Sequence, residues 1–597
     1  MATPTTSVDR EKLRAYLLGA LEAKLPEIRR HARPDGRMGT DPWICRDQHD
    51  ILTLALLYRT EGSSIYRDSA TLELIAKGGA YLTKMQDEKG MWRFDKKDGS
   101  YWGQIFMPWT YVRWIITYGL IRDELPAAER TEWDKGLQLG YTGIVATELS
   151  SLSNIYPGPL TGQPPLAPGE VRPWLHNIPA HHATGLFLAG KYFNRPEWQE
   201  QARAFMQLLI AEQNEHGWWT EHRGPVVLYN RVYIEALGIY YAASGDDSVL
   251  AALERGNRFH LNYHYPNGAM IETVDERNPY PVLKVETGAE GATTYRPPNI
   301  NIHPGLYFTD EGRALLAHQL PLIAAQDPAG LEAAEFLLLH LPADGALAYR
   351  SAPERRFLMG GDALIAREDP WIVSLSAYCC ERTPNRFIQD RQNLISIYHR
   401  DAGLIIGGGN TKLQPFWSTL TVGDPRLVSP VGATRETNLA PDAAVTYTPE
   451  ACSITELEPR LWVQRISAAG AEIEWSFAII SASAMRLTLR LLKPALDGRA
   501  VASHLTFIPY LGSTARLSNG TEHKLTAEAW QETGLNALAH HNWQLSLPDS
   551  ATVRWPVLPH NPYTNDGHAE FPEGRLVVSL PLDAAQPKHG LTLTIGR

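Results

Sequence analysis

Three histidines and an asparagine open an otherwise apolar segment, WLHNIPAHHATGLFLAGKYF, at residues 174–193. Pro179 suits the first position of a helix, with Asn177 or the isoleucine after it as the cap. His181 and His182 then fall in the first turn, where free backbone N–H groups favour an anion. A carboxylate bound there would meet amide donors and imidazoles together. In the alternative interpretation Asn177 only caps the helix, and the histidines bond to neighbouring loops.

A second polar cluster follows about 40 residues later, in HGWWTEHRGPVVLYNRVYIEALG. Tyr229 and Tyr233 are four residues apart and could face the same side of an amphipathic helix, which Gly245 closes. The aromatic pair before them could form a platform for a sugar ring, or could be ordinary packing at the end of a helix pair. In chain order the cluster comprises Trp218, Trp219, Glu221, His222, Arg223, Tyr229, Asn230, Arg231 and Tyr233.

These residue types are the ones that β-elimination from a uronic acid requires. The substrate carboxylate must be neutralised so that the C5 proton becomes acidic, and Asn, Arg or protonated His can do this. A base, His or ionised Tyr, removes the proton. An acid, commonly Tyr, protonates the departing glycosidic oxygen. The two clusters together therefore predict proton-transfer chemistry on an acidic sugar.

Composition excludes several other function classes. The formal charge of −10 is spread along the chain without a basic run, so nucleic acid is not an expected partner. The content of 17 Trp and 25 Tyr favours carbohydrate binding. The four cysteines show neither metal-ligand spacing nor a disulfide framework. No apolar segment is long enough to span a membrane, and the opening residues lack the core of an export signal, so we expect a cytoplasmic protein or an exported one whose signal was removed.

Helical periodicity continues to about residue 385. EKLRAYLLGALEAKL places leucines four apart on one face, and similar runs recur at 49–60, 71–86, 106–120, 180–193, 197–213, 231–243, 247–260 and 327–340. Comparable turns follow several runs, with glycines suited to left-handed C-caps at Gly90, Gly217, Gly268 and Gly345. Weak repetition of helix pairs predicts a ring of hairpins, an (α/α) toroid.

After residue 390 the period changes to two. MRLTLRLL alternates Leu487, Leu489 and Leu491 with polar residues, as a half-buried strand does. We therefore expect a C-terminal antiparallel β-sandwich, with domains at 1–385 and 386–597 and a boundary within CCERTPNRFIQDRQN. The Gly- and Pro-rich loop at 285–305 is either a connector or an edge of the site.

Helical hairpins followed by an antiparallel β-domain resemble the polysaccharide lyases with an α/α toroid, which include chondroitin/hyaluronate, alginate and heparinase-type lyases. The resemblance implies that Asn177, with His181 or His182, neutralises the carboxylate, although HNIPAHH stands where many alginate lyases have NNH. It implies His222 as the base and Tyr229 or Tyr233 as the acid or combined acid/base. Arg223, six residues before Tyr229, is similar to the Arg and Tyr pairing of alginate lyases.

The same resemblance implies residues that contact the glycan and leaves room for a divalent cation. Several of these lyases bind such an ion, but no ligand set in the sequence singles out a site, and no organic cofactor is implied. The expected partner is an acidic polysaccharide or oligosaccharide. The expected substrate-binding residues are Trp174, His176, Trp218, Trp219, Glu221, Arg231 and His399.

The main alternative is a glycoside hydrolase on the same helical ring, acting on uronic-acid-containing oligosaccharides. It needs two carboxylates that flank the scissile bond. Asp47 and Asp50, three residues apart, are candidates together with Glu221 or Glu235. A sugar epimerase would also use paired histidines on such a ring, but its usual single domain fits poorly with the β-rich half. A noncatalytic glycan-binding protein would not need titratable groups clustered in one region.

Overall fold

The computed structural model describes residues 6–95, 101–147, 149, 177–221, 224–266, 270–271, 273–274, 286–287, 293–294, 302–324, 334–343, 347–379, 394–407, 414–423, 448–559 and 567–596. Contacts divide the chain into two compact units. The first, called the helical unit below, comprises Met1–Thr220, Tyr229–Leu261 and Asn301–Ala352. The second, called the β-unit, comprises Glu221–Leu228, Asn262–Ile300 and Pro353–Arg597.

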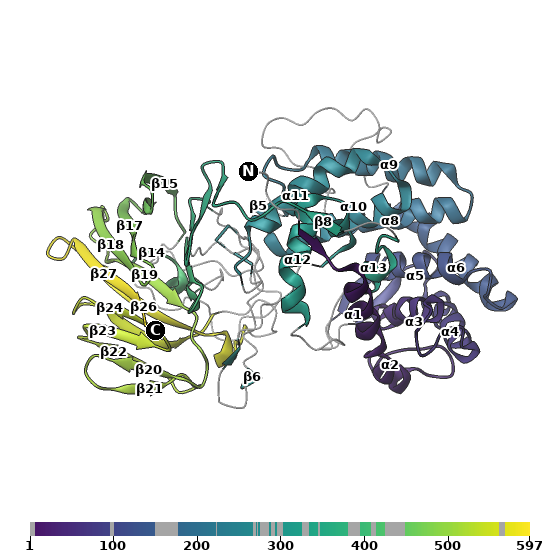
Figure 1. The fold of residues 1–597 in the computed structure, drawn as a ribbon, viewed down its shortest axis with the longest axis horizontal. Helices are drawn as coiled ribbons and strands as arrows, with labels where there is room; N and C mark the ends of the chain where they lie inside the picture. Colours follow the sequence, from purple (N-terminus) through teal and green to yellow (C-terminus); the bar gives the residue numbers. More distant parts are fainter. Residues whose placement is uncertain are drawn as a thin grey trace. The chain divides into compact units, whose positions relative to one another are not determined.

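Helices pack against their sequence neighbours through most of the first unit, as α8 packs along α9 (Figure 1). The helices in chain order are α1 (Arg10–Glu22), α2 (Leu25–His31), η1 (Cys45–His49), α3 (Asp50–Arg59), α4 (Ser69–Met85), α5 (Pro108–Ile121), α6 (Ala127–Ala146), α8 (Asn177–Tyr192), α9 (Pro196–Ala211), α10 (Val227–Ser244), η2 (Asp247–Val249), α11 (Leu250–Asn262), η3 (Pro304–Tyr307), α12 (Asp310–Ala324) and α13 (Ala334–Leu339). Short strands accompany them: β1 (Thr6–Val8) pairs with β8 (Leu347–Tyr349), and β2 (Trp92–Asp95) pairs with β3 (Tyr101–Ile105).

Helix α6 lies outside the runs that periodicity predicted, because glycines occupy part of its buried stripe. Its buried residues are Trp133, Gly136, Leu137, Gly140, Tyr141 and Ile144, at the spacing of one helix face. A side chain at Gly140 would collide with the Tyr111 ring, so the close approach of α5 and α6 requires glycine there. Helix α12 also lies outside the runs that periodicity predicted.

Two turns of the helical unit have the same geometry, as the recurrent glycines predict. Gly90 has a φ of +90° and Gly217 a φ of +95°. A glutamine after the preceding helix, Gln86 or Gln213, donates its side-chain amide to the glycine carbonyl at 3.4 and 3.3 Å. The prediction that these glycines are helix C-caps is wrong. They lie inside the turns, because α4 ends at Met85 and α9 ends at Ala211. Gly268 and Gly345 lie outside the described residues.

Helices α8 and α10 are neighbours and run parallel. His181 Nε2 donates to the Val232 carbonyl at 3.2 Å, and the Thr184 hydroxyl donates to the Ala236 carbonyl at 3.0 Å. Both contacts advance in the same direction along the two helices, which fixes their register. Helix α8 is buried on every side from Pro179 to Gly190, as expected of an inner helix of a ring.

The β-unit is a sandwich of two antiparallel sheets, as the alternating pattern predicts. Among the described residues one sheet has ten strands and the other nine. The ten are β9 (Arg356–Met359), β10 (Ala363–Glu368), β11 (Trp371–Ser376), β12 (Ile395–His399), β13 (Gly403–Ile406), β14 (Leu420–Val422), β19 (Val501–Phe507), β22 (Trp530–Thr533), β25 (Thr552–Val557) and β26 (Arg575–Leu582). The nine are β15 (Ala451–Glu458), β16 (Leu461–Ala468), β17 (Ala471–Ser481), β18 (Ala484–Lys493), β20 (Thr514–Leu517), β21 (Glu522–Lys524), β23 (Ala537–His540), β24 (Trp543–Ser546) and β27 (Lys588–Ile595).

One hydrophobic core lies between the two sheets. Inward-facing residues of both sheets form it, including Trp371, Trp462, Trp475 and Trp543. In β18 the buried residues alternate with exposed ones and include Leu487 and Leu489. The predicted fold, a helical toroid followed by an antiparallel β-sandwich, is confirmed.

Strands β9, β10 and β11 begin before residue 385, within the part of the chain that periodicity predicted to be helical. They pair in register with each other, and β11 pairs with β12. Strand β11 is buried at all six positions, from Trp371 to Ser376, and only its last four residues, VSLS, alternate between apolar and polar. A run this short cannot be told from helix by its period. The last segment of the β-unit begins at Pro353, and the unit also takes Glu221–Leu228 and Asn262–Ile300 from the part predicted as one helical domain.

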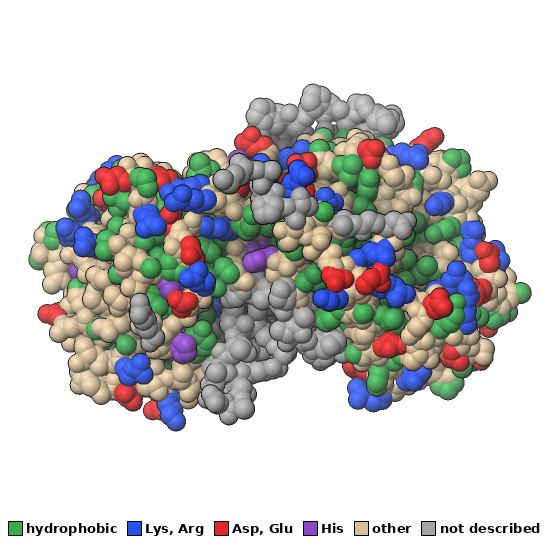
Figure 2. Space-filling model, in the orientation of Figure 1, with side chains coloured by type: hydrophobic (Ala, Val, Ile, Leu, Met, Phe, Trp, Pro, Cys, Tyr) green, Lys and Arg blue, Asp and Glu red, His purple; other side chains and the backbone are tan. Residues whose placement is uncertain are grey.

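Charged side chains of both signs are interspersed on the face shown in Figure 2, in keeping with the even spread of charge along the sequence. Among the described residues, every helix is too short or too polar to cross a lipid bilayer.

Candidate functional site

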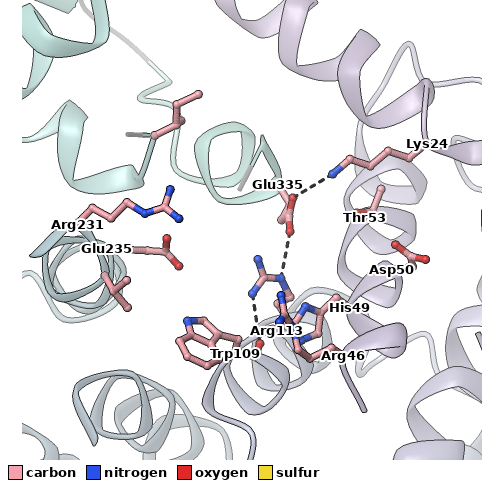
Figure 3. Close-up of a pocket in the computed structure, with 12 residues that line it drawn as sticks. Lys24, Arg46, His49, Asp50, Thr53, Trp109, Arg113, Arg231, Glu235 and Glu335 are labelled. Carbon is pink, nitrogen blue, oxygen red and sulfur yellow. Dashed lines mark hydrogen bonds and ion pairs between the residues drawn. The ribbon is translucent and has the colours of Figure 1, made fainter. Parts of the chain in front are cut away.

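A cavity of about 340 Å³ opens inside the helical unit (Figure 3). Its lining combines four cationic side chains, three carboxylates and one indole with a few smaller groups. The lining residues are Lys24, Arg46, His49, Asp50, Thr53, Trp109, Arg113, Arg231, Val232, Glu235, Ile302 and Glu335. All belong to the helical unit.

Most of these residues come from the first two turns of α3, α5, α10 and α13. Asp50 starts α3, Trp109 and Arg113 lie near the start of α5, Arg231 lies near the start of α10, and Glu335 lies near the start of α13. Helix N-termini carry partial positive charge and free N–H groups. The helix ends and the cationic side chains therefore act together to attract an anion.

Glu335 ties three parts of the helical unit together. Its carboxylate accepts from Arg113 Nε at 3.1 Å and lies 3.8 Å from Lys24 Nζ, and only 6% of its side chain is exposed. Burial raises the pKa of Glu335, but the charges of Arg113 and Lys24 outweigh burial, so the pKa lies below its usual value. Figure 3 shows this carboxylate between the two cations. Glu335 is therefore ionised at neutral pH and holds Arg113 in place.

Asp50 differs from Glu335 in its protonation. Burial raises the pKa of Asp50 to about 7, against the opposing charge of Lys24 and with a further rise from Glu335. A carboxyl group with this pKa can donate or accept a proton near neutral pH. The neighbouring His49, whose Nε2 lies 2.9 Å from the Thr110 hydroxyl, is neutral because burial lowers its pKa well below the usual value.

The three predicted residues of α8 lie beside the cavity and not in its lining. The helix begins at Asn177, so His181 and His182 fall beyond its first turn, where backbone N–H groups are already used within the helix. Burial lowers the pKa of His181 to about 3, with help from the Arg113 charge. His181 is therefore neutral at pH 7, and the prediction that His181 and His182 lie in the first turn is wrong. Its ring packs 5.9 Å from Trp109, and the ring of His182 packs 6.5 Å from Phe106.

The parallel register places Asn177 and Tyr229 at the same end of neighbouring helices. His181 contacts the Val232 carbonyl, and one helical turn earlier on both helices lie Asn177 and Tyr229. Asn177 is buried, whereas Tyr229 is partly exposed. The end of the helix pair at which they lie is the one beside the cavity, since Val232 lines it.

Tyr233 and Trp219 pack against each other in the interior of the helical unit. Their rings are stacked, with centroids 5.1 Å apart and an interplanar angle of 13°. Trp219 is 2% exposed and donates Nε1–H to the Leu209 carbonyl at 2.7 Å. This arrangement matches the packing interpretation of Trp219 rather than the sugar platform, while Trp218 beside it is half-buried.

His399 is enclosed within the β-unit. Its Nε2 donates to the Ala482 carbonyl at 2.9 Å, and the Asp401 backbone N–H donates to Nδ1 at 3.1 Å. The side chain is buried, and its ring packs against Trp371. Both ring nitrogens are thus engaged, which leaves none for the predicted contact with substrate.

Four of the predicted site residues, Trp174, His176, His222 and Arg223, lie outside the described residues, as does the side chain of Glu221. Only some of the carboxylates that a hydrolase would use lie in the cavity. Asp50 and Glu235 line the cavity, but Asp47 accepts from the Ile44 N–H and caps η1. Among the residues described, no group of three His, Cys, Asp or Glu side chains could hold a metal ion.

Sequence reasoning identified Arg231, Asp50 and Glu235 but missed most of the lining. Glu335 could have been noticed as an acidic residue inside the apolar run AAEFLLL, because a carboxylate is seldom buried without a partner. Arg113 likewise interrupts PWTYVRWIITYG. Ile302 lies in the 285–305 loop, which was expected as a possible edge of the site. The lining residues that the sequence reasoning missed are Lys24, Arg46, His49, Thr53, Trp109, Arg113, Val232 and Glu335.

No protein-family model matches this sequence, and no curated protein matches it. Solved structures match over almost the whole chain. The chondroitin AC lyase of Streptomyces coelicolor A3, solved in complex with chondroitin sulphate, is 13% identical with a TM-score of 0.56, over 99% of this chain and 81% of that one. A Paenibacillus xanthan lyase is 12% identical with a TM-score of 0.55, over 98% of this chain and 57% of that one.

This chain thus spans little more than half the length of the xanthan lyase. At such identities the likeness concerns the fold alone, and the predicted resemblance is confirmed at that level. The protein has the fold of the α/α-toroid polysaccharide lyases.

Proposed function

We propose that this protein is a polysaccharide lyase that cleaves uronic-acid-containing glycans by β-elimination. The observation that carries the proposal is the register of α8 and α10, which brings Asn177 and Tyr229 to one end of the helical unit beside a cation-lined cavity. The fold shared with the two lyases supports it. In the chondroitin lyase structure the bound ligand is chondroitin sulphate.

The residues would divide the reaction between them as follows. The Asn177 amide and the Arg231 guanidinium hold the uronate carboxylate, which makes the C5 proton acidic. A base, His222 or ionised Tyr229, takes that proton. The bond from C4 to the glycosidic oxygen then breaks, a C4–C5 double bond forms, and the phenol of Tyr229 gives its proton to the leaving oxygen.

Tyr229 suits the acid role better than Tyr233 does. Tyr233 is fully buried and stacked on Trp219, so a substrate could reach its hydroxyl only after the core had opened. Tyr229 is partly exposed and one turn closer to the helix start. Neutral His181 would hold the register of the two helices through Val232 and would not carry charge.

Ultraviolet absorbance of the products tests the proposal. The wild type, incubated with a panel of uronate glycans, should release products with a conjugated double bond. Tyr229→Phe should abolish turnover and leave glycan binding intact, because only the proton-transfer group is lost. Tyr241→Phe on the same helix is the matched control, since its hydroxyl contacts Asp247 away from the cavity. Near-normal turnover in Tyr229→Phe would refute the role of this phenol.

A second candidate function is glycoside hydrolysis, and one observation favours it. Asp50 and Glu235 line the same cavity, and the raised pKa of Asp50, about 7, is what a general acid at neutral pH needs. The products separate the two functions, because hydrolysis yields saturated fragments without the chromophore. Asp50→Asn should abolish hydrolysis but should leave elimination by Tyr229 in place.

A further inference from the structure

The cavity of the helical unit has a floor. A channel through the ring would leave one side of each inner helix exposed, and α5, α8 and α10 each contain a stretch beyond the cavity that has no such side. Residues 114–118 of α5, 179–190 of α8 and 236–240 of α10 are buried at every position. Trp109 and Arg113 of α5 and Glu235 of α10 are partly exposed and belong to the cavity lining, and the next partly exposed residues, Gly119 in α5 and Tyr241 in α10, come only after the fully buried stretches.

The inner helices set the direction in which the cavity opens. Most of its lining comes from the first two turns of helices, and Asn177 and Tyr229 lie one turn nearer the helix starts than the α8–α10 contact at the cavity wall. The carboxylate-binding Asn177 and the proton-transferring Tyr229 therefore stand at the mouth, and the cavity continues inward from them. A glycan whose scissile bond lies at the mouth would place its next residues inside.

Size and charge define what the cavity can hold. A volume of about 340 Å³ is at the small end of ligand pockets, which suits about two sugar rings at most. Arg46, Arg113 and Arg231 can bind carboxylate or sulfate groups, and Glu235 can accept from sugar hydroxyls. Trp109 offers an apolar face to a ring.

We infer that the cavity receives the terminal one or two residues of an acidic glycan, so that the protein cleaves from a chain end. A polymer cannot pass through a blind cavity, and only a terminus can enter it. The inference rests on the proposed cleavage of acidic glycans and adds the part of the substrate that is recognised. Short products of uniform size should then leave the chain one after another.

The size distribution of products at low conversion tests the inference. Reducing ends count cleavage events by either chemistry, and chromatography reports fragment lengths. We expect one short product from the earliest time while the remaining chains stay long. A ladder of intermediate lengths would overturn chain-end recognition. Saturated products would refute β-elimination and leave this inference standing, so the two failures are distinguishable.

Binding provides a second test that needs no turnover. For Tyr229→Phe with uronate oligosaccharides and polymers of increasing length, we expect about one protein bound per glycan molecule at every length. A number that grows with glycan length would refute the inference, because internal segments would then bind.

Two arginine variants check that the binding takes place in the cavity. Arg46 lines it and is exposed, so Arg46→Met should fold and should weaken binding of a short uronate oligosaccharide at least tenfold. Arg122→Met is the control, since Arg122 follows the end of α5 and packs over Tyr192. Equal affinity in both variants would place the binding site elsewhere.

Discussion

Replacement of Glu335 by Gln should destabilise the helical unit. Glu335 is the shared partner of Arg113 and Lys24, whose side chains are 12% and 20% exposed. The substitution keeps the shape of the side chain but leaves two poorly hydrated cations next to a neutral amide. Removal of one partner from a buried ion pair typically costs about 3–5 kcal/mol. We take the lower value, about 3 kcal/mol, because both cations retain some contact with water.

The expected shift follows from the size of the unit. At about 2 °C per kcal/mol for a large domain, the unfolding midpoint should fall by about 6 °C. Far-ultraviolet circular dichroism reports the loss of helix during thermal unfolding. Glu73→Gln is the matched control, because Glu73 pairs with Lys77 on the exposed face of α4 and its loss should leave the midpoint unchanged.

Acid pH provides an internal check. The pKa of Glu335 is lower in the folded protein than its usual 4.5. Its ionised form therefore contributes stability above pH 4.5, and this contribution is lost as the pH falls through the folded pKa. The wild type and Glu335→Gln should then converge in acid. Equal midpoints for Glu335→Gln and Glu73→Gln at pH 7 would refute the role assigned to this carboxylate.

Three further predictions concern the site and the ring. Asn177→Ala should lower turnover of a uronate glycan about 10²–10³-fold, the usual loss for a donor that stabilises a developing anion; an unchanged rate would make Asn177 only a helix-start residue. Asp50→Asn should raise the unfolding midpoint at pH 8 more than at pH 4. Folding raises the pKa of Asp50 to about 7, so the wild type loses stability as the pH rises towards that value. Parallel pH profiles of the unfolding midpoint for wild type and variant would contradict this. Gly217→Ala should destabilise the protein more than Gly62→Ala. Both glycines have positive φ, but only a side chain at Gly217 would collide with a neighbouring backbone carbonyl. Equal unfolding midpoints for the two variants would show that the turn can adapt.

Periodicity predicted the architecture because each unit has a repeated physical pattern. Strand β18 keeps one face in the core, so its period of two is visible in the sequence. Strand β11 is buried on both faces, and its alternation covers only four residues, which is too short to tell a strand from a helix. In α6 the close packing of α5 replaces apolar side chains with glycines, and the helical stripe loses its signal.

Residue types in the sequence identified the part of the site on α8 and α10 but not most of the cavity lining. Asn177, Tyr229 and Arg231 stand in two polar clusters that a reader of the sequence can find. Glu335 and Lys24 are more than 300 residues apart, and only the closure of the ring brings them to 3.8 Å. The neutral state of His181 could not be read from the sequence either, because burial sets its pKa.

The masses of the fragments released from a uronate glycan test the central claim most directly. Elimination divides the substrate without adding water, so the fragment masses should sum to the mass of the glycan, and one fragment should absorb in the ultraviolet. The products of the wild type should show both properties, and Tyr229→Phe should form none. Fragments that together weigh one water more than the glycan, with no chromophore, would contradict the proposed reaction.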